Sequence, residues 1–392
     1  MSLTPLRIAV IGVGNIGSAH AKTLYTNSVE GAVLSAVRDT DPKKRLIAQE
    51  EYKGVRAFAS TEELFKARVC DAVIVSVPHP SHAEVCLQAL SADLHVLVEK
   101  PVDITVTKAI QLNKAFKASG KVFGIMFNQR TTPIFQRARE LVRGRELGEV
   151  KRSVWIITNW YRDQAYYDSG DWRASWQGEG GGVLMNQAPH NLDLWQWILG
   201  MPKTVSASCE YGKYHNIEVE DDCTINATWE NGAKGVFITS TGEYPGTNRL
   251  EISLTKGKMV LESSTLKLWK YSNDEREFCF DPSKKPSKEE VEYSETVFEP
   301  HRGGHRLIVQ NFTDAILKGA ELLSPGYDGI NQISLTNAAY LSQWLDKPVT
   351  LPFDNELYDK LLEERIKNSV TSKKEGEFSP QSTYKDRWQV NW

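Results

Sequence analysis

The sequence lacks the features that mark disulfide-rich, secreted and membrane proteins. Its 392 residues include five cysteines, an odd number, and no two of them are spaced as CxxC. We therefore expect reduced thiols and no disulfide framework. No apolar run approaches the roughly 18–20 residues of a membrane-spanning helix, and the N-terminal MSLTPLRIAVIG has no signal-peptide anatomy. These absences predict a cytoplasmic protein without a membrane partner.

An excess of charge of one sign is also missing. The 47 Lys and Arg residues nearly balance 50 Asp and Glu residues, so no basic surface for nucleic acid is indicated. His79, His82 and Cys86 are close in sequence, but they flank a proline and lack the usual zinc-ligand spacing. We expect no metal site there. The length predicts two domains, and the composition, 41% hydrophobic and 25% charged, is that of an ordinary globular protein.

A glycine motif follows the first strand-like segment. Residues 6–12, LRIAVIG, are apolar and β-branched, and residues 18–27 have the pattern of a helix. A GxGxxG between a strand and a helix indicates dinucleotide binding, since its glycines allow a tight turn, close approach of the pyrophosphate and packing of the helix on the strand. The phosphates bind at the helix N-terminus. The predicted cofactor-binding residues are Gly12, Gly14, Asn15, Ile16 and Gly17.

A carboxylate follows the second predicted strand. Residues 34–37 end at Arg38 and Asp39, and Asp39 lies 22 residues beyond Gly17. This is the spacing of the carboxylate that accepts hydrogen bonds from the adenosine ribose. It favours NAD, because a carboxylate repels the 2′-phosphate of NADP. Arg38 could accommodate that phosphate, so NADP stays possible, and the alternative role of Asp39 is to cap the helix that begins near Pro42.

Strands and helices continue to alternate through the first half. Residues 71–77, 95–99 and 122–127 are short apolar runs, as in strands covered on both faces. We predict a doubly wound parallel sheet, in which ligands bind outside the carboxyl ends of the strands. Lys100 follows one such end. Burial beside a cofactor would lower its pKa and allow proton exchange with a hydroxyl, and Pro101 stiffens the backbone after it. The alternative is a solvated lysine near a loop.

The second half has a different pattern. A helix is predicted at 133–143 and further helices near 304–318 and 329–345. Between them, stretches that alternate polar and apolar residues predict an antiparallel sheet with one open face: 149–158, 204–213, 221–230, 234–241, 249–255, 258–263 and 265–271. Such a face can cover a cofactor or pack against a second copy. We expect a Rossmann domain at 1–128, a second domain at 129–355 and a tail at 356–392, extended from 366 with a tryptophan docked.

The stretch GGGVLMNQAPHNLDLWQW at 180–197 places polar groups among apolar ones. We expect a mostly buried helix over 186–199, with Asn186, His190 and Asp193 on one face at i, i+4 and i+7. Buried polar groups are costly unless they are paired or used. The alternative is a hydrogen-bond network within the core. For His190 we favour function, because histidine is the side chain best matched to proton exchange near neutral pH.

Taken together, these motifs resemble those of the Gfo/Idh/MocA oxidoreductase family, which includes glucose–fructose oxidoreductase and inositol dehydrogenase. The resemblance rests on GVGNIG, Asp39, the proline and histidine after the 71–77 strand, Glu99-Lys100-Pro101 and GGGVLMNQAPHNLDL. EVEDDCTINATWENGAKG, HRLIVQNFTDAI and PVTLP resemble the family's second domain, so the resemblance spans about residues 6–352. It implies a Rossmann domain joined to an α/β domain with a large open sheet, assembled as a homodimer or homotetramer through that sheet.

The resemblance also implies roles for individual residues. Lys100 and His190 match the catalytic lysine and histidine, and Asn186 stands where inositol dehydrogenases have an aspartate. An asparagine cannot relay a proton, although it can bind a substrate hydroxyl. The expected substrate-binding residues are Asn186, Asp193, Arg130, Trp172, Arg173 and Trp160, although aromatic residues in such a segment are more often packing. Further expected cofactor-binding residues are Val77, Pro78, His82, Glu99, Lys100 and Asn128.

The family implies reversible oxidation of a hydroxyl group on a carbohydrate or cyclitol substrate with NAD(P). The form of the GGG motif, with SGDWRASW before it, is similar to the branch containing levoglucosan dehydrogenase and other sugar or glycoside dehydrogenases. Two alternatives stay open: an NAD-dependent glycosidase, which oxidises and then re-reduces one sugar carbon, and a regulator that binds NAD(P) without catalysis. Because Lys100 and His190 are both present, we expect a dehydrogenase.

Overall fold

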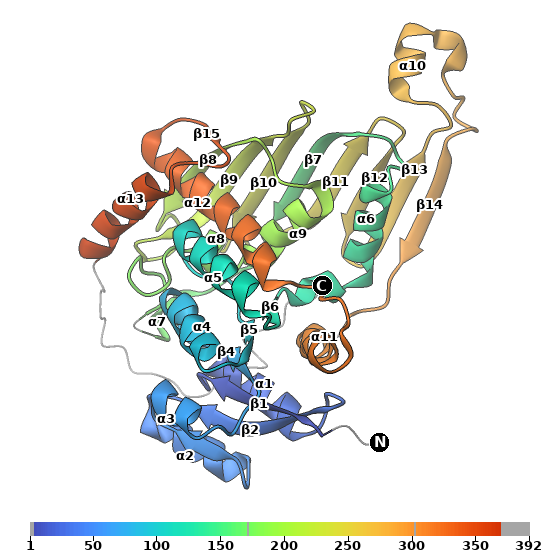
Figure 1. The fold of residues 1–392 in the computed structure, drawn as a ribbon. Coiled ribbons are helices and arrows are strands. Elements are labelled where there is room, and N and C mark those ends of the chain that lie inside the picture. The colour runs from blue at the N-terminus through green and yellow to red at the C-terminus, as the bar shows by residue number, and fades with distance from the viewer. Residues whose placement is uncertain (1–3, 171, 302, 370–392) are drawn as a thin grey trace. The chain divides into compact units, whose positions relative to one another are not determined.

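Two sheets organise the chain in the computed structural model, which describes residues 4–170, 172–301 and 303–369 (Figure 1). The first unit is Met1–Thr131 with Gly303–Ile333, and the second is Thr132–Arg302 with Ser334–Trp392. This division differs from the contiguous domains 1–128 and 129–355 expected above. The reason lies in helix α11 (Gly304–Lys318), whose Ile308, Val309 and Phe312 join the hydrophobic core of the first unit.

The first unit contains a six-stranded parallel sheet in the order β3-β2-β1-β4-β5-β6. The order reverses between β1 and β4, which is where ligands bind in doubly wound sheets. The predicted doubly wound parallel sheet is confirmed. Its strands are β1 (Leu6–Ile11), β2 (Ala32–Arg38), β3 (Arg56–Phe58), β4 (Ala72–Val75), β5 (His95–Val98) and β6 (Phe123–Ile125).

Helices cover this sheet. Ala21 and Leu24 of α1 pack with Phe312 of α11 and with Val10 of β1 in one core, and α4 and α5 pack on each other. A fully buried Val, Leu, Ile or Phe side chain contributes about 1.5–3 kcal/mol to the free energy of unfolding. The apolar strands are therefore a main source of the stability of this unit. The helices are α1 (Asn15–Tyr25), α2 (Pro42–Glu51), α3 (Thr61–Lys66), α4 (His82–Ser91), α5 (Val106–Ser119) and α11.

The second unit contains a nine-stranded sheet in the order β14-β13-β12-β11-β7-β10-β9-β8-β15. Only β7 and β10 pair in parallel among its described strands, so the predicted, mostly antiparallel sheet is confirmed. The two edge strands, β14 and β15, were not expected from the sequence. The strands are β7 (Val150–Ile157), β8 (Thr204–Tyr211), β9 (Glu220–Thr228), β10 (Lys234–Ser240), β11 (Asn248–Leu254), β12 (Gly257–Glu262), β13 (Thr265–Lys270), β14 (Glu292–Val297) and β15 (Val349–Thr350).

One face of this sheet is covered by α6 (Pro133–Arg143) and α9 (Pro189–Leu199). Trp195 of α9 donates a hydrogen bond from Nε1 to Ser153 Oγ at 3.0 Å, and its ring lies 5.5 Å from that of Phe237. Helix α12 (Gly329–Leu345) reaches β8, where Gln343 Oε1 accepts from the backbone N–H of Cys209 at 2.9 Å. The remaining helices of this unit are α7 (Gln164–Asp168), α8 (Val183–Asn186), α10 (Glu275–Phe280) and α13 (Asn355–Lys367).

The continuous helix predicted over 186–199 is wrong. Helix α8 ends at Asn186, and α9 begins at Pro189. A proline has no N–H to donate, and its ring clashes with the carbonyl four residues earlier, so it begins a new helix instead of continuing the old one. Asn186 therefore does not share a helix with His190 and Asp193, which lie about one turn apart on α9.

The C-terminal segment also differs from the expected tail. Helix α13 (Asn355–Lys367) occupies the start of the predicted tail, 356–392, and its first turn is capped by Asp354 accepting from Leu357 N at 3.1 Å. Tyr358 and Leu362 are buried. The predicted docking of Trp388 or Trp392 lies outside the described residues. Within the described part of the chain, no helix is long and apolar enough to cross a membrane.

Candidate functional site

The glycine loop of the first unit leaves room for a phosphate at one position. Gly12 has φ +89°, and a Cβ there would lie 2.5 Å from the carbonyl oxygen of Ser76. A Cβ on Gly17 would lie 1.8 Å from the carbonyl oxygen of Gly12, so that glycine permits close packing of α1. A Cβ on Gly14 would meet nothing within 4 Å. The loop is thus constrained at its first and third glycines and open at the second.

Helix α1 begins directly after this open position. Its N-cap is Gly14, and no side chain of the described residues caps it. Asn15 is exposed and Ile16 is half-buried. The first backbone N–H groups of a helix have no partner within it, and the helix dipole adds positive potential. Asn15 and Ile16 therefore contribute donors suited to an anionic group.

Asp39 connects the end of β2 to the glycine loop. Its Oδ2 accepts from Val13 N at 2.9 Å, and its Oδ1 accepts from Asp41 N at 2.9 Å. Helix α2 is capped by Asp41, which accepts from Lys43 N at 2.8 Å, so capping is not the role of Asp39. Arg38 beside it is half-buried. An open glycine loop, a helix N-terminus and a carboxylate at the next strand end fit a dinucleotide.

His82 links two loops at the carboxyl edge of the sheet. Its Nδ1 lies 2.7 Å from the carbonyl oxygen of Pro101, and its Nε2 lies 2.8 Å from that of Val77. Burial lowers the pKa of His82, which favours the neutral ring. The exposed Pro78 follows Val77. Val77, Pro78 and His82 are thus brought close to the Glu99-Lys100-Pro101 segment.

A buried cluster lies next to Lys100. Glu99 Oε1 is 2.7 Å from Nε2 of His20, and the ring of His20 is 5.7 Å from that of His305. Burial opposes ionisation of Glu99, but the hydrogen bond and charge of His20 outweigh it and lower its pKa to about 2. Burial lowers the pKa of His305 to about 4. Neither histidine was among the site residues expected from the sequence. His20 could have been noticed from its place three residues after GxGxxG.

Lys100 is the second residue after the end of β5 and is half-buried. Its backbone N–H donates to Glu99 Oε2 at 3.2 Å, which fixes the backbone that carries the lysine side chain. The Glu99 carboxylate also contacts His20, and this buried contact holds the Glu99-Lys100-Pro101 segment in place.

Arg130, which was expected to bind substrate, is buried in the first unit. The side chain is 1% exposed, and its Nη1 donates to Asp328 Oδ2 at 2.7 Å and to the Leu323 carbonyl at 3.3 Å. These contacts join the segment after α11, which contains Leu323 and Asp328, to the turn Asn128–Thr131 that follows β6. Asn128 begins this turn and is half-buried, with its carbonyl accepting from the Thr131 hydroxyl at 2.7 Å.

In the second unit, Asn186 belongs to a polar network. Its Nδ2 donates to Glu179 Oε1 and lies 3.3 Å from the Tyr166 hydroxyl. Arg173 Nη1 donates to the same hydroxyl at 2.8 Å and lies 3.8 Å from Glu179 Oε1. Gln187 Nε2 is 3.2 Å from that hydroxyl. Sequence reasoning missed Tyr166 and Glu179, although a carboxylate immediately before three glycines was a visible signal for the second.

Glu220 supports the backbone of the glycine stretch. Its Oε2 accepts from Gly182 N and its Oε1 from Leu184 N, both at 2.9 Å, and Tyr340 donates to Oε1 at 2.7 Å. Burial raises the pKa of Glu220 to about 7. A Cβ on Gly182 would lie 1.9 Å from the Glu220 carbonyl oxygen, so only glycine permits this approach.

The remaining predicted residues of this unit have mixed surroundings. His190 is the second residue of α9, and Asp193 is 1% exposed and accepts from Gln196 Nε2 at 2.9 Å. Trp160 is buried and donates to Asn191 Oδ1 at 3.1 Å, which is the packing role considered for aromatic residues. Trp172 is more accessible, at 37% exposed, and Arg173 lies 4.5 Å from its ring centre.

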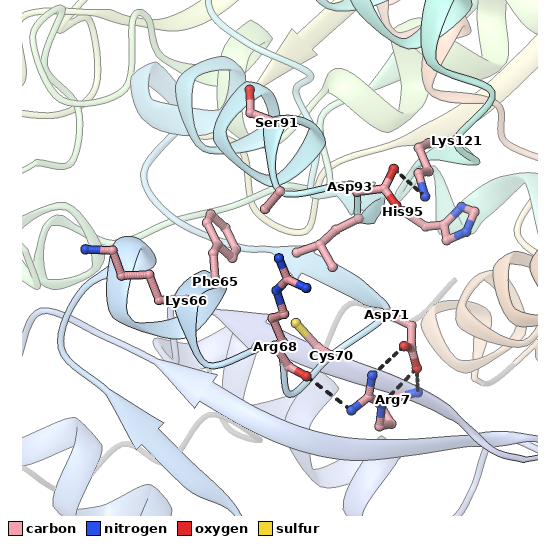
Figure 2. A pocket seen from close by; sticks show the side chains of 12 residues that line it. Arg7, Phe65, Lys66, Arg68, Cys70, Asp71, Ser91, Asp93, His95 and Lys121 are labelled. Atoms are coloured by element: carbon pink, nitrogen blue, oxygen red, sulfur yellow. Dashed lines mark hydrogen bonds and ion pairs between the residues drawn. The ribbon is translucent and has the colours of Figure 1, made fainter.

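A surface pocket of about 760 Å³ lies elsewhere in the first unit, and Figure 2 shows its side chains. Arg7 pairs with Asp71 at 2.7 Å and Lys121 with Asp93 at 2.8 Å. Arg7, Asp71 and His95 lie at the amino ends of β1, β4 and β5. The pocket is therefore at the opposite sheet edge from the glycine loop. No group of three or more potential metal ligands occurs among the described residues.

Comparison with known proteins identifies the relatives of this chain. Residues 6–127 match the oxidoreductase family with an NAD-binding Rossmann fold, and residues 135–260 match the GFO/IDH/MocA C-terminal domain. The chain belongs to the GFO/IDH/MocA oxidoreductase family. This oxidoreductase thus carries an NAD-binding Rossmann domain, as the glycine motif predicted.

Three proteins illustrate the similarity. Myo-inositol 2-dehydrogenase of Thermotoga maritima is 27% identical over 267 residues, which are 66% of this chain and 75% of that protein. D-glucoside 3-dehydrogenase of Escherichia coli is 28% identical over 232 residues, 59% of this chain and 64% of that protein. The WlbA dehydrogenase of Chromobacterium violaceum, solved with NADH and UDP-GlcNAcA, is 26% identical, covers 90% of this chain and 98% of its own, and has a TM-score of 0.77.

Proposed function

We propose that this oxidoreductase reversibly oxidises a secondary hydroxyl group of a sugar, inositol or glycoside, with NAD as its cofactor. The main support is the arrangement within the first unit. The glycine loop follows β1 and Lys100 follows β5, and the carboxyl ends of these parallel strands lie at one sheet edge. The names of the Thermotoga and Escherichia relatives, an inositol and a glucoside dehydrogenase, support a cyclic polyol as substrate.

The glycine loop and the N-terminus of α1 would hold the pyrophosphate, and Asp39 would accept hydrogen bonds from the adenosine ribose. Residues near Val77, His82 and Asn128 would line the part of the cofactor beyond the pyrophosphate and the adenosine ribose. The carboxylate of Asp39 favours NAD over NADP. When bound, the cofactor accepts a hydride from the carbinol carbon or returns one.

Lys100 would take the proton of the substrate hydroxyl and return it in the reverse direction. Glu99, paired with His20, accepts a hydrogen bond from the backbone N–H of Lys100, which fixes the backbone position from which the lysine side chain extends. His190 would serve as the second acid–base group. Acid–base assistance of this kind contributes roughly 10²–10⁴ to the rate. Asn186, Asp193, Arg173 and Trp172 would hold the other groups of the substrate.

Self-association through the nine-stranded sheet is also proposed. Trp155 and Phe237 face the helices and are buried, whereas their neighbours Val154, Ile156, Val236 and Ile238 point to the opposite face and are only half-buried. A second copy packed on this apolar face would give a homodimer or homotetramer. Light scattering after size exclusion measures the mass, and a Val154→Lys variant that stays as associated as wild type would exclude this face.

The first experiment screens the purified protein with NAD and NADP against inositols, free hexoses, anhydrosugars and glycosides, following the absorbance of the reduced nicotinamide. Turnover of one ring type would support the proposal and identify the substrate class. Silence across the panel, with NAD co-purifying, would favour the NAD-dependent glycosidase or the non-catalytic regulator instead.

A further inference from the structure

We propose that Glu179 is a positioning residue that fixes the side-chain amide of Asn186, so that Asn186 meets the substrate with its carbonyl oxygen as a hydrogen-bond acceptor. This inference rests on the proposed function, because it takes Asn186 as a substrate-binding residue. It assigns a task to a buried carboxylate that the proposed chemistry does not otherwise use.

The carboxylate of Glu179 is held from two sides. Its side chain is 2% exposed, its Oε2 accepts from the backbone N–H of Ala174 at 2.6 Å, and its Oε1 accepts from Asn186 Nδ2. An ionised carboxylate can only accept hydrogen bonds, whereas an asparagine side chain has one donating and one accepting end. The nitrogen end of Asn186 must therefore face Glu179.

Tyr166 strengthens this orientation. Its hydroxyl oxygen lies 3.3 Å from Asn186 Nδ2 and 2.8 Å from Arg173 Nη1. Because a guanidinium can only donate, the tyrosine oxygen acts as an acceptor there. Both neighbours of the asparagine nitrogen offer acceptor oxygens, and the Glu179 carboxylate, which cannot donate, sets the rotation of the amide. The carbonyl oxygen, turned away from both, would accept a hydroxyl hydrogen of the substrate.

The first test replaces Glu179 with glutamine, which keeps the shape of the side chain but can donate as well as accept. Ala174 N–H still needs an oxygen acceptor, so the glutamine NH₂ faces Asn186, and the asparagine amide turns over to point its nitrogen at the substrate. We expect KM for the sugar to rise about 10- to 100-fold, in line with the cost of leaving a buried polar group without its partner, with a smaller change in kcat. NAD affinity should stay unchanged, because the glycine loop belongs to the other unit.

The second test reverses the hydrogen bond. Asn186→Asp alone places two carboxylates in contact, which repel unless they share a proton, and KM should rise at least as much as in E179Q. The double variant E179Q/N186D restores one donor and one acceptor with the same total charge. We expect it to recover most of the wild-type KM. Additive losses in the double variant would overturn the proposal, because they would mean that the two side chains act independently.

A readout without turnover keeps the test decisive. In protein labelled with ¹⁵N-asparagine, the Asn186 side-chain signal, assigned by its loss in N186D, should show one NH₂ proton shifted downfield and protected from exchange. E179Q should abolish both properties. An Asn186 signal that is the same in wild type and E179Q would overturn the proposal. If wild type turns over no sugar but this signal behaves as expected, the proposed function fails while the positioning by Glu179 stands.

A matched control separates orientation from folding. Glu218 accepts from the backbone N–H of Trp176 at 2.8 Å, just as Glu179 does from that of Ala174. E218Q should therefore disturb the same segment without changing the Asn186 signal or KM for the sugar. A KM increase in E218Q equal to that in E179Q would reassign Glu179 to anchoring of the backbone.

Discussion

His20 Nε2 lies 2.7 Å from Glu99 Oε1, and the two side chains are 2% and 7% exposed. The pair joins α1, which begins at the glycine loop, to the end of β5, where Lys100 begins the next turn. A hydrogen bond that involves a charged group is worth about 1.5–3 kcal/mol, and removing one buried partner costs more than the bond itself contributes. The cofactor loop and the proposed catalytic lysine are therefore tied together through the interior of one unit.

Lys100→Ala should abolish turnover and leave NAD binding nearly intact. The variant removes the proposed acid–base group, so we expect kcat to fall by about 10²–10⁴, while the glycine loop keeps its donors. Steady-state kinetics and calorimetric titration of NAD measure the two effects. Lys108→Ala is the control, because Lys108 is 42% exposed on α5 and should retain wild-type turnover. Survival of turnover within a few-fold in Lys100→Ala would exclude the proposed mechanism.

His305→Phe should flatten the loss of stability in mild acid. The ordinary pKa of histidine is 6.5, and burial lowers that of His305 to about 4. Between these values the unfolded chain binds a proton that the folded chain does not, so this residue reduces the free energy of unfolding as pH falls from 6.5 to 4. The two and a half pH units correspond to about 3 kcal/mol.

Urea unfolding at pH 7, 5.5 and 4.5 measures this effect as the difference between wild type and His305→Phe. Glu99 acts in another window: its lowered pKa stabilises the fold above 4.5, and this contribution is lost as pH falls through about 2. Parallel pH profiles of the two proteins between 6.5 and 4 would contradict the prediction.

Much of the fold was predictable because local signals agreed with it. Helices 133–143, 304–318 and 329–345 have the predicted bounds, with Pro133 beginning the first and Gly319, in the left-handed region, ending the second. The strands of the first sheet are apolar because both their faces are covered. β14 gave no such signal, since all six of its residues are exposed and it is held by pairing with β13 alone.

The site was predictable in its residue types and less so in its contacts. The glycine loop and Asp39 follow from spacing, because strand–turn–helix geometry is local. The network of Asn186, Tyr166 and Glu179 joins three separate segments, and no periodicity relates them. The break before Pro189 was visible as a proline, but the apolar pattern on both sides of it favoured one helix. The return of α11 to the first unit joins residues about 300 positions apart, which no local pattern encodes.

Asp39→Asn should weaken NAD more than NADP. Asparagine keeps one acceptor oxygen for the backbone N–H groups of Val13 and Asp41, and it removes the negative charge that repels a 2′-phosphate and attracts the ribose hydroxyls. We expect the ratio of the two dissociation constants to shift towards NADP by about tenfold, equivalent to about 1.4 kcal/mol. Asp41→Asn, which alters only the cap of α2, is the control and should change both affinities equally. An equal loss for both cofactors in Asp39→Asn would leave Asp39 a purely structural role.

Glu220→Gln should change how stability depends on pH. The ordinary pKa of glutamate is 4.5, and burial raises that of Glu220 to about 7. As pH rises from 4.5 through 7, the unfolded chain releases a proton that the folded chain retains, so this group lowers the free energy of unfolding by about 3 kcal/mol over that range. Glutamine does not titrate, and the variant should lack this slope.

The same variant also loses an acceptor. Glutamine offers one oxygen where the carboxylate accepts from Gly182 N, Leu184 N and Tyr340, so we expect a constant loss of about 1–3 kcal/mol at every pH. Urea unfolding at pH 5, 6, 7 and 8 separates the constant loss of unfolding free energy from its change with pH. Tyr340→Phe supplies the complementary measurement: it removes a donor that favours the ionised carboxylate, so stability should fall more steeply towards pH 8 than in wild type. Identical slopes in wild type, Glu220→Gln and Tyr340→Phe would mean that Glu220 is ionised throughout this range in the folded protein.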